Sequence, residues 1–240
     1  MTSAAVPALL SDVVRSADRF LATAARLDEE RLRAPSALAG WSRAHVLAHV
    51  ARGAEAYIRL LDEAESGGSG TRADATALAE ATASAVALPA DELLADLRTS
   101  VDRFVVRART LPEPAWEALV TALAGWRHPA WFTLHRCRRE LETHHADLDA
   151  GYGSAEWPAS YVTWALDDTL RSLAARGFAL GTVEATDLGR TWRLSPHGPS
   201  PAAPGHVLLA WLAGRAPASG VHPAPLPKPP GWPLPPVPGW

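Results

Sequence analysis

The stretch from Arg138 to Asp149 reads Arg-Arg-Glu-Leu-Glu-Thr-His-His-Ala-Asp-Leu-Asp. It says more about the fold and the chemistry of this chain than any other stretch of the sequence. Glu140 and His144 are four residues apart, so in a helix their side chains lie on one face. Glu142 and His145 are expected to point elsewhere. A carboxylate and an imidazole on one helical face can be two ligands of a divalent-metal site.

A third ligand is expected from another helix. The segment from Trp41 to His49 contains His45 and His49, which are one helical turn apart, and the spacing allows either of them to complete the site. Two imidazoles and one carboxylate suit divalent zinc, with a fourth position left for water or a substrate sulfur. Helical bundles bring such residues together because their helices run side by side.

Less specific interpretations fit the same residues. A Glu-x-x-x-His pair can be a surface interaction worth roughly 0.2–0.5 kcal/mol. His45 can be a core or supporting histidine, and Cys137 is expected to be a small buried apolar residue rather than a ligand or nucleophile. The sequence contains no Gly-rich phosphate-binding loop, no Gly-x-Ser-x-Gly elbow and no His-Glu-x-x-His motif. Metal binding is therefore the one chemistry that the residue spacing specifically predicts.

Composition narrows the class of protein. The chain has 240 residues, of which 48% are hydrophobic and 20% are charged, with a net charge of -3, which is typical of a folded protein with a core. Nucleic acid is not an expected partner, because no basic stripe with interleaved aromatic residues occurs. A single cysteine, no N-terminal signal pattern and no apolar run of about 18 residues predict a cytoplasmic protein without a membrane partner.

Apolar residues recur at helical spacing in four long segments, which predict helices over about 4–27, 42–66, 91–110 and 129–151. Ser42 is suited to cap the second helix, after a loop that ends at Gly40-Trp41, and Pro129 suits the first turn of the fourth helix. The run Gly67-Gly68-Ser69-Gly70 predicts a flexible loop, and residues 74–87 are only weakly amphipathic. These segments predict an antiparallel four-helix bundle over residues 1–155.

The pattern changes after Trp157-Pro158. We expect a fifth helix over 159–176, then two β-prone runs (178–185 and 190–194) joined at Asp187-Leu188-Gly189, then an apolar helix that ends at Gly214-Arg215. These elements predict a small α/β domain over 156–215 that packs on the bundle. Residues 216–240 are Pro-rich and predict an extended tail, which Trp232 and Trp240 could pin to the domain surface.

Three stretches carry a resemblance to a known family: Leu38–Arg52, Arg139–Tyr152 and Leu208–Arg215. Their order resembles the DinB-like metal-binding four-helix bundles, and among these it is most similar to the mycothiol-dependent maleylpyruvate isomerase family. The resemblance spans roughly residues 5–215. It implies a mainly α fold, with a DinB-like four-helix bundle and a small C-terminal α/β domain.

The resemblance also implies a ligand set. In the family, the histidine of a Trp-x-x-x-x-x-Leu-x-His pattern binds the metal, and this pattern maps onto His49; Glu140 and His144 match the other two ligands. Zinc, or another divalent metal, and the thiol mycothiol are the implied cofactors. Arg52 and Arg215 are the candidates to hold substrate carboxylates. A surface salt bridge for Arg52 and a helix C-terminal charge for Arg215 are the alternatives.

The implied activity is a metal- and mycothiol-dependent cis-trans isomerisation of an unsaturated dicarbonyl acid such as maleylpyruvate. A thiol would add to the double bond, the resulting single bond would rotate, and the thiol would leave. A mycothiol S-transferase and a non-catalytic metal or small-molecule binding protein are the alternatives. The expected partners are a small-molecule substrate and a low-molecular-weight thiol, and the expected assembly is a monomer or weak homodimer.

Two positions depart from the family pattern. Gly53 occupies a position where the family often has asparagine, and the segment Gly68–Asp74 lacks the usual Pro-Met-Tyr sequence. That segment is expected to help shape the substrate pocket. The sequence therefore identifies a metal chemistry and leaves the exact substrate open.

Overall fold

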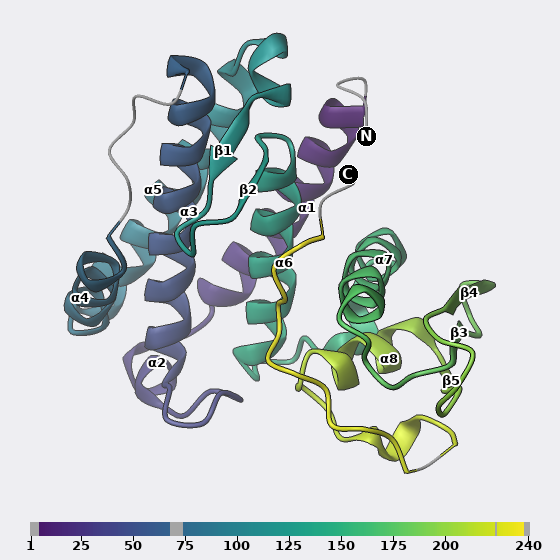
Figure 1. Ribbon diagram of the computed structural model, residues 1–240. Helices are drawn as coiled ribbons and strands as arrows, with labels where there is room; N and C mark the ends of the chain where they lie inside the picture. The colour runs from purple at the N-terminus through teal and green to yellow at the C-terminus, as the bar shows by residue number, and fades with distance from the viewer. Residues whose placement is uncertain (1–4, 68–73, 224, 238–240) are drawn as a thin grey trace. The chain divides into compact units, whose positions relative to one another are not determined.

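Figure 1 shows the computed structural model of the chain, which describes residues 5–67, 74–223 and 225–237. Contacts within the chain divide it into two compact units, Met1–Gly151 and Tyr152–Trp240. The domains expected over 1–155 and 156–215, followed by a tail over 216–240, stay a prediction. Within the described ranges, no helix is both long enough and apolar enough to span a bilayer.

Four long helices form the first unit: α1 (Val6–Ala24), α3 (Arg43–Ser66), α5 (Ala90–Thr110) and α6 (Phe132–Asp147). Helix α3 packs against α5 and α6, and α1 packs against the same two helices, which closes a four-helix bundle (Figure 1). Buried apolar side chains from all four helices fill its core, among them Phe20, Leu47, Leu61, Leu97, Phe104, Leu134 and Leu141. The predicted mainly α fold with a four-helix bundle is confirmed.

Helix α3 begins and ends where its sequence predicts. The Ser42 side chain accepts a hydrogen bond from the backbone N–H of His45 and so caps the first turn. At the other end Gly67 adopts a left-handed conformation, with φ of 74°, which a residue without a Cβ tolerates easily. The flexible loop predicted at Gly68–Gly70 lies outside the described residues.

Helix α6 starts later than predicted, because Pro129 is not in its first turn. Pro129 ends strand β2 (Arg127–Pro129), which pairs antiparallel with β1 (Leu119–Thr121). Strands of three residues are too short to show an alternating pattern in the sequence. A proline is tolerated at the end of such a strand because its missing N–H costs the ladder little. The hairpin occupies the connection between α5 and α6.

Two shorter helices complete the first unit. Helix α2 (Glu29–Arg33) lies inside the segment predicted as a loop, where the Asp28 side chain accepts from the backbone N–H of Arg31 and caps it. A helix of five residues is too short to show a helical period. Helix α4 (Ala75–Val86) forms from the weakly amphipathic Ala-rich segment and packs on α3.

The second unit combines two helices and a small sheet. Helix α7 (Ala159–Ala175) packs against α8 (Gly205–Leu212), and the sheet has strand order β4-β3-β5. Strand β3 (Thr182–Ala185) pairs antiparallel with β4 (Arg190–Arg193), as the predicted hairpin requires. Strand β5 (Ala202–Ala203) pairs parallel with β3 and was not predicted, since two residues carry no strand pattern.

The Pro-rich segment is anchored to the second unit. The indole Nε1–H of Trp232 donates to Thr169 Oγ1 at 3.0 Å, and the Val221 side chain is buried. The predicted pinning by Trp232 is therefore confirmed, whereas Trp240 lies outside the described residues. Short 3-10 turns cover Glu113–Glu117, Ser154–Glu156 and Ala218–Gly220.

Candidate metal centre

Helices α3 and α6 bring three potential metal ligands together. One ligand atom from each of His49, Glu140 and His144 lies within 4.8 Å of the other two. His49 Nε2 is 3.3 Å from Glu140 Oε2, and His144 Nε2 is 3.1 Å from the same oxygen. The two imidazole rings are nearly perpendicular, with centroids 4.8 Å apart. The pair predicted on α6 therefore meets a histidine of α3 across the seam between the two helices.

Asp147 orients the His144 ring. His144 Nδ1 is 2.9 Å from Asp147 Oδ2, and Asp147 is buried. Because the carboxylate accepts from Nδ1, Nε2 is the nitrogen turned toward Glu140. Burial by itself would lower the pKa of His144, but its hydrogen bonds with Asp147 and Glu140 outweigh burial and raise the pKa to about 9.

Tyr57 engages the second oxygen of Glu140. The Tyr57 hydroxyl donates to Glu140 Oε1 at 3.3 Å, which leaves Oε2 to the two imidazoles. Burial would raise the pKa of Glu140, yet the hydrogen bonds from His144 and His49 hold it well below its usual range. Burial raises the pKa of the Tyr57 phenol, so this group stays protonated and serves as a donor. Glu140 is thus an ionised carboxylate with one oxygen free to bind a cation.

These residues fit a divalent metal of the zinc type. Two imidazole nitrogens and one carboxylate oxygen form a donor set that open zinc sites use. His144 has its ring fixed by a carboxylate, which is the usual supporting arrangement for a metal-binding histidine. The Trp41 ring lies against His49, with centroids 5.3 Å apart, and gives the other imidazole an apolar support. The chemistry and the orientation of the donors both favour metal binding.

His45 has a different role from His49. Its Nδ1 accepts from the backbone N–H of Ser42 at 3.2 Å and lies 2.8 Å from the Ser42 hydroxyl, so the ring completes the cap of α3. Within the described parts of the chain, the group of potential ligands contains His49 and omits His45. Between the two histidines that the spacing left open, the geometry favours His49, which is also the one that the family pattern implies.

Glu142 and His145 of α6 contact α1 rather than the cluster, and Cys137 is a buried thiol. Cys137 is buried, and burial raises the pKa of its thiol, so it remains a protonated apolar group as expected. The Glu142 carboxylate pairs with Arg19 at 2.5 Å. His145 Nε2 lies 2.7 Å from the Thr23 hydroxyl. Both contacts are with α1, in agreement with the predicted orientation of Glu142 and His145.

Arg52 is paired with carboxylates of its own unit. Its Nη2 lies 2.6 Å and 2.5 Å from the two oxygens of Asp96 and 3.4 Å from Glu55. This ion pair joins α3 to α5, which is the structural alternative to a role in substrate binding. A substrate carboxylate would have to compete with Asp96, so the predicted catalytic role of Arg52 stays a prediction.

Arg215 belongs to the second unit. Its Nη1 donates to the carbonyl oxygen of Ala213 at 2.9 Å, and its guanidinium lies 5.9 Å from the centre of the Trp232 ring. The first contact matches the helix C-terminal role, because Ala213 is the C-cap of α8. The predicted role of Arg215 with substrate also stays a prediction.

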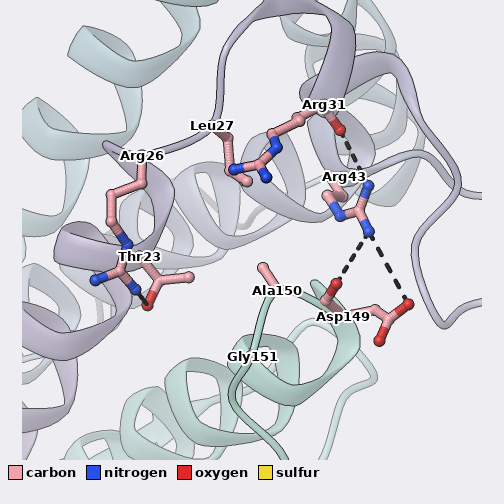
Figure 2. Close-up of a pocket in the computed structure, with 8 residues that line it drawn as sticks. All are labelled: Thr23, Arg26, Leu27, Arg31, Arg43, Asp149, Ala150 and Gly151. Carbon is pink, nitrogen blue, oxygen red and sulfur yellow. Dashed lines mark hydrogen bonds and ion pairs between the residues drawn. The ribbon is translucent and has the colours of Figure 1, made fainter.

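A concave region lies at the end of the bundle where the start of α3 meets the end of α6 (Figure 2). It has a volume of about 250 Å³ and is lined by Thr23, Arg26, Leu27, Arg31, Arg43, Asp149, Ala150 and Gly151. The Arg43 guanidinium donates to the carbonyl oxygens of Leu148, Asp149 and Arg31 at 2.6, 2.9 and 3.2 Å. Arg43 therefore ties the last turn of α6 to the first residue of α3, and this helps to keep His144 opposite His49.

Sequence reasoning overlooked Tyr57. Tyr57 follows His49 by two helical turns on α3, and that i, i+8 spacing is the signal that could have found it. Asp147 had no predicted role, and its contact with His144 supplies one. Both residues act on the predicted ligands rather than replacing them.

Comparisons with known proteins point to one family. Residues 13–149 match the family described as the mycothiol maleylpyruvate isomerase N-terminal domain. No curated protein matches the sequence. A crystal structure of the mycothiol-dependent maleylpyruvate isomerase has the same fold, with a TM-score of 0.87 and 24% identity over 97% of this chain and 100% of that chain.

A variant of that enzyme with one histidine replaced by alanine is equally similar, with a TM-score of 0.86 and 24% identity over the same shares of the two chains. At this identity the two crystal structures establish the fold. The family match is independent of them, covers more than half of the chain and includes His49, Glu140 and His144. The chain therefore belongs to the family of the mycothiol maleylpyruvate isomerase N-terminal domain.

Proposed function

We propose that this protein is a metal- and mycothiol-dependent isomerase that converts the cis double bond of an unsaturated dicarbonyl acid, of the maleylpyruvate type, into the trans form. The observation that carries the proposal is the convergence of His49, Glu140 and His144 within 4.8 Å in a chain of this family. A cytoplasmic location and a monomeric or weakly dimeric state remain expectations.

His49, Glu140 and His144 would hold zinc or another divalent metal. The bound ion would supply a Lewis acid that keeps a thiol sulfur ionised near neutral pH and polarises a carbonyl group. The contact with Asp147 leaves His144 Nε2 as the atom that would bind the ion, and the contact with Tyr57 leaves Glu140 Oε2 as the other. The substrate needs its double bond to become a single bond that can rotate, and reversible addition of a thiol achieves this.

Elemental analysis tests the ligand assignment. We expect about one divalent ion per chain in protein purified without added metal. The substitutions His49→Ala and His144→Ala should each remove it, because each takes away a third of the protein ligands. His45→Ala is the matched control, one turn away on the same helix, and should retain the ion. If His45→Ala loses the metal and His49→Ala keeps it, the assignment on α3 is wrong.

Product analysis tests the reaction. With maleylpyruvate and mycothiol, the enzyme should form the trans isomer and return the thiol unchanged. Activity should be lost when either mycothiol or the metal is removed. Consumption of the thiol with formation of a thioether would identify an S-transferase instead. Tight metal binding without any thiol-dependent turnover would identify a non-catalytic binding protein.

A further inference from the structure

Arg136 lies one helical turn before Glu140 on α6, and no carboxylate balances its charge. Among residues 5–67, 74–223 and 225–237, it forms no ion pair within 4.0 Å, whereas Arg52 is matched by both Asp96 and Glu55. Arg136 is also partly exposed, so solvent and small ions can reach it. A fixed guanidinium without a counter-charge is a natural receptor for an anion.

Aromatic rings hold the Arg136 guanidinium in place. Its central carbon is 5.0 Å from the centre of the Tyr57 ring and 4.8 Å from that of Trp126. Contacts of this kind occupy the faces of the guanidinium plane and leave its edges, where the N–H groups are, available for hydrogen bonds. The side chain is thus ordered before any ligand binds.

His128 occupies one edge of the Arg136 guanidinium. His128 Nδ1 is 2.8 Å from the carbonyl oxygen of Pro129, so Nδ1 carries the proton and donates. Nε2 is then an acceptor, and Arg136 Nη1 donates to it at 3.2 Å. In the part of the chain that the structure describes, Nε and Nη2 of Arg136 make no other hydrogen bond. That pair of nitrogens is the fork that binds a carboxylate through two parallel bonds.

Tyr57 connects this guanidinium to the candidate metal centre. Its ring lies on Arg136 while its hydroxyl donates to Glu140 Oε1 at 3.3 Å. Four residues of helix separate Arg136 from Glu140 by about 6 Å along the axis. On α3, Gly53 lies between His49 and Tyr57, and a Cβ at Gly53 would meet no atom within 4 Å. The space directly beside Gly53, between these two residues, is therefore open.

We propose that Arg136 binds a carboxylate of the substrate while the reacting part of the same molecule lies at the candidate metal centre. The inference rests on the proposed function, because it requires an unsaturated acid as the ligand. It assigns the role predicted for Arg52 to a guanidinium that has no competing carboxylate. A purely structural role, in which Arg136 only fastens the β1–β2 hairpin to α3, is the alternative.

Titration calorimetry of the metal-loaded protein with maleate, an unreactive cis-dicarboxylate, tests the binding. The wild type should bind maleate. Arg136→Met should raise the dissociation constant by about 10–100-fold, as expected for loss of charge-assisted hydrogen bonds. Arg127→Met removes the same charge from an exposed position of the same hairpin and should change binding less than about twofold. Equal loss in both variants, or no loss in Arg136→Met, overturns the proposal.

Kinetics separate carboxylate recognition from a structural role. Arg136→Met should lower kcat/KM for maleylpyruvate by about 10–100-fold, and should have little effect on the analogue whose terminal carboxylate is an amide. Arg136→Lys keeps the charge without the fork and should be intermediate. A similar loss with both substrates would mean that Arg136 is only structural. Thermal melting identifies any variant that fails to fold. If Arg136→Met does not fold, the two substrates are compared with Arg136→Lys instead.

The two proposals fail in different ways. If the wild type binds maleate through Arg136 but does not isomerise any thiol-activated substrate, the proposed reaction is wrong and the anion site remains. If the wild type isomerises maleylpyruvate and Arg136→Met does so equally well, the reaction remains and the role of Arg136 is wrong.

Discussion

At the residue scale, the site depends on side chains that orient the candidate ligands. His144 would have two nitrogens to offer, and the bond from Nδ1 to Asp147 leaves only Nε2 for the cluster. Glu140 would have two oxygens, and the Tyr57 hydroxyl occupies one of them. Each supporting contact removes an alternative orientation before the metal binds, which lowers the entropic cost of binding.

Replacing Asp147 tests this support directly. Asp147→Asn should weaken zinc affinity by about 10–100-fold, because an amide orients the His144 ring poorly and does not increase its basicity. Competition with a chelator of known affinity measures the change. Asp149→Asn is the matched control, because it makes the same substitution two residues away on a side chain that is 76% exposed. Equal zinc affinity in the wild type and Asp147→Asn would contradict the supporting role.

At the element scale, the cap of α3 determines where His49 stands. Ser42 begins the helix, and the His45 ring accepts the backbone N–H of Ser42, so two side chains satisfy groups that the first turn leaves unpaired. The helix then presents His49, Gly53 and Tyr57 on one stripe, at intervals of four residues. A shifted start would rotate this stripe away from α6.

Removal of the cap should destabilise the protein. Ser42→Ala is expected to lower the free energy of unfolding by about 1 kcal/mol, since the backbone N–H of His45 loses its acceptor. Urea unfolding followed by circular dichroism measures the difference. Ser84→Ala, at an exposed position within α4, is the control and should change stability by less than about 0.5 kcal/mol. Equal stability of Ser42→Ala and the wild type would show that His45 alone caps the helix.

At the scale of the whole molecule, α6 carries unusually many buried polar groups. Its contacts with α1 include the pairs Arg19–Glu142 at 2.5 Å and Asp12–Arg138 at 2.7 Å. Glu142 and Arg138 are buried, and such charges are tolerated only because they are paired. The four helices therefore share an apolar core, and α1 and α6 also meet along a seam of buried, paired charges.

Buried histidines on and before α6 make this stability depend on pH. Burial, together with the smaller effect of nearby arginines, lowers the pKa of His128 to about 4 and that of His135 to about 3. The pKa of histidine in the unfolded chain is about 6.5. Below that pH the unfolded chain therefore binds protons that the folded chain does not bind until the pH is lower. The free energy of unfolding should therefore fall as pH falls from 6.5 to 4, by on the order of 1–3 kcal/mol per histidine.

Urea unfolding at several pH values measures the effect. His128→Asn should reduce the slope of stability against pH in this window by up to about 1.4 kcal/mol per pH unit, which is the value for one proton. His197→Asn, at an exposed position of the second unit, should leave the slope unchanged. An unaltered slope in His128→Asn would contradict the assignment of a buried neutral histidine.

Much of the fold follows from local patterns. The long helices, the Ser42 cap, the hairpin of β3 and β4 and the pinning tryptophan Trp232 are each predicted by a few neighbouring residues. The short elements are not, because α2 and the strands β1, β2 and β5 have two to five residues and carry no period. Pro129 was misplaced for the same reason, since a proline fits the end of a strand as well as the start of a helix.

The sequence by itself determined that Glu140 and His144 share a helical face, because that follows from the period of the α-helix alone. Spacing alone did not distinguish His45 from His49; the family resemblance pointed to His49, and the tertiary structure brings His49 beside Glu140. Only the tertiary structure decided which arginine is available: Arg52 is paired with Asp96 across α5, whereas Arg136 is held by aromatic rings. Both outcomes depend on contacts with residues of other helices, which no pattern of neighbouring residues in the sequence can reveal.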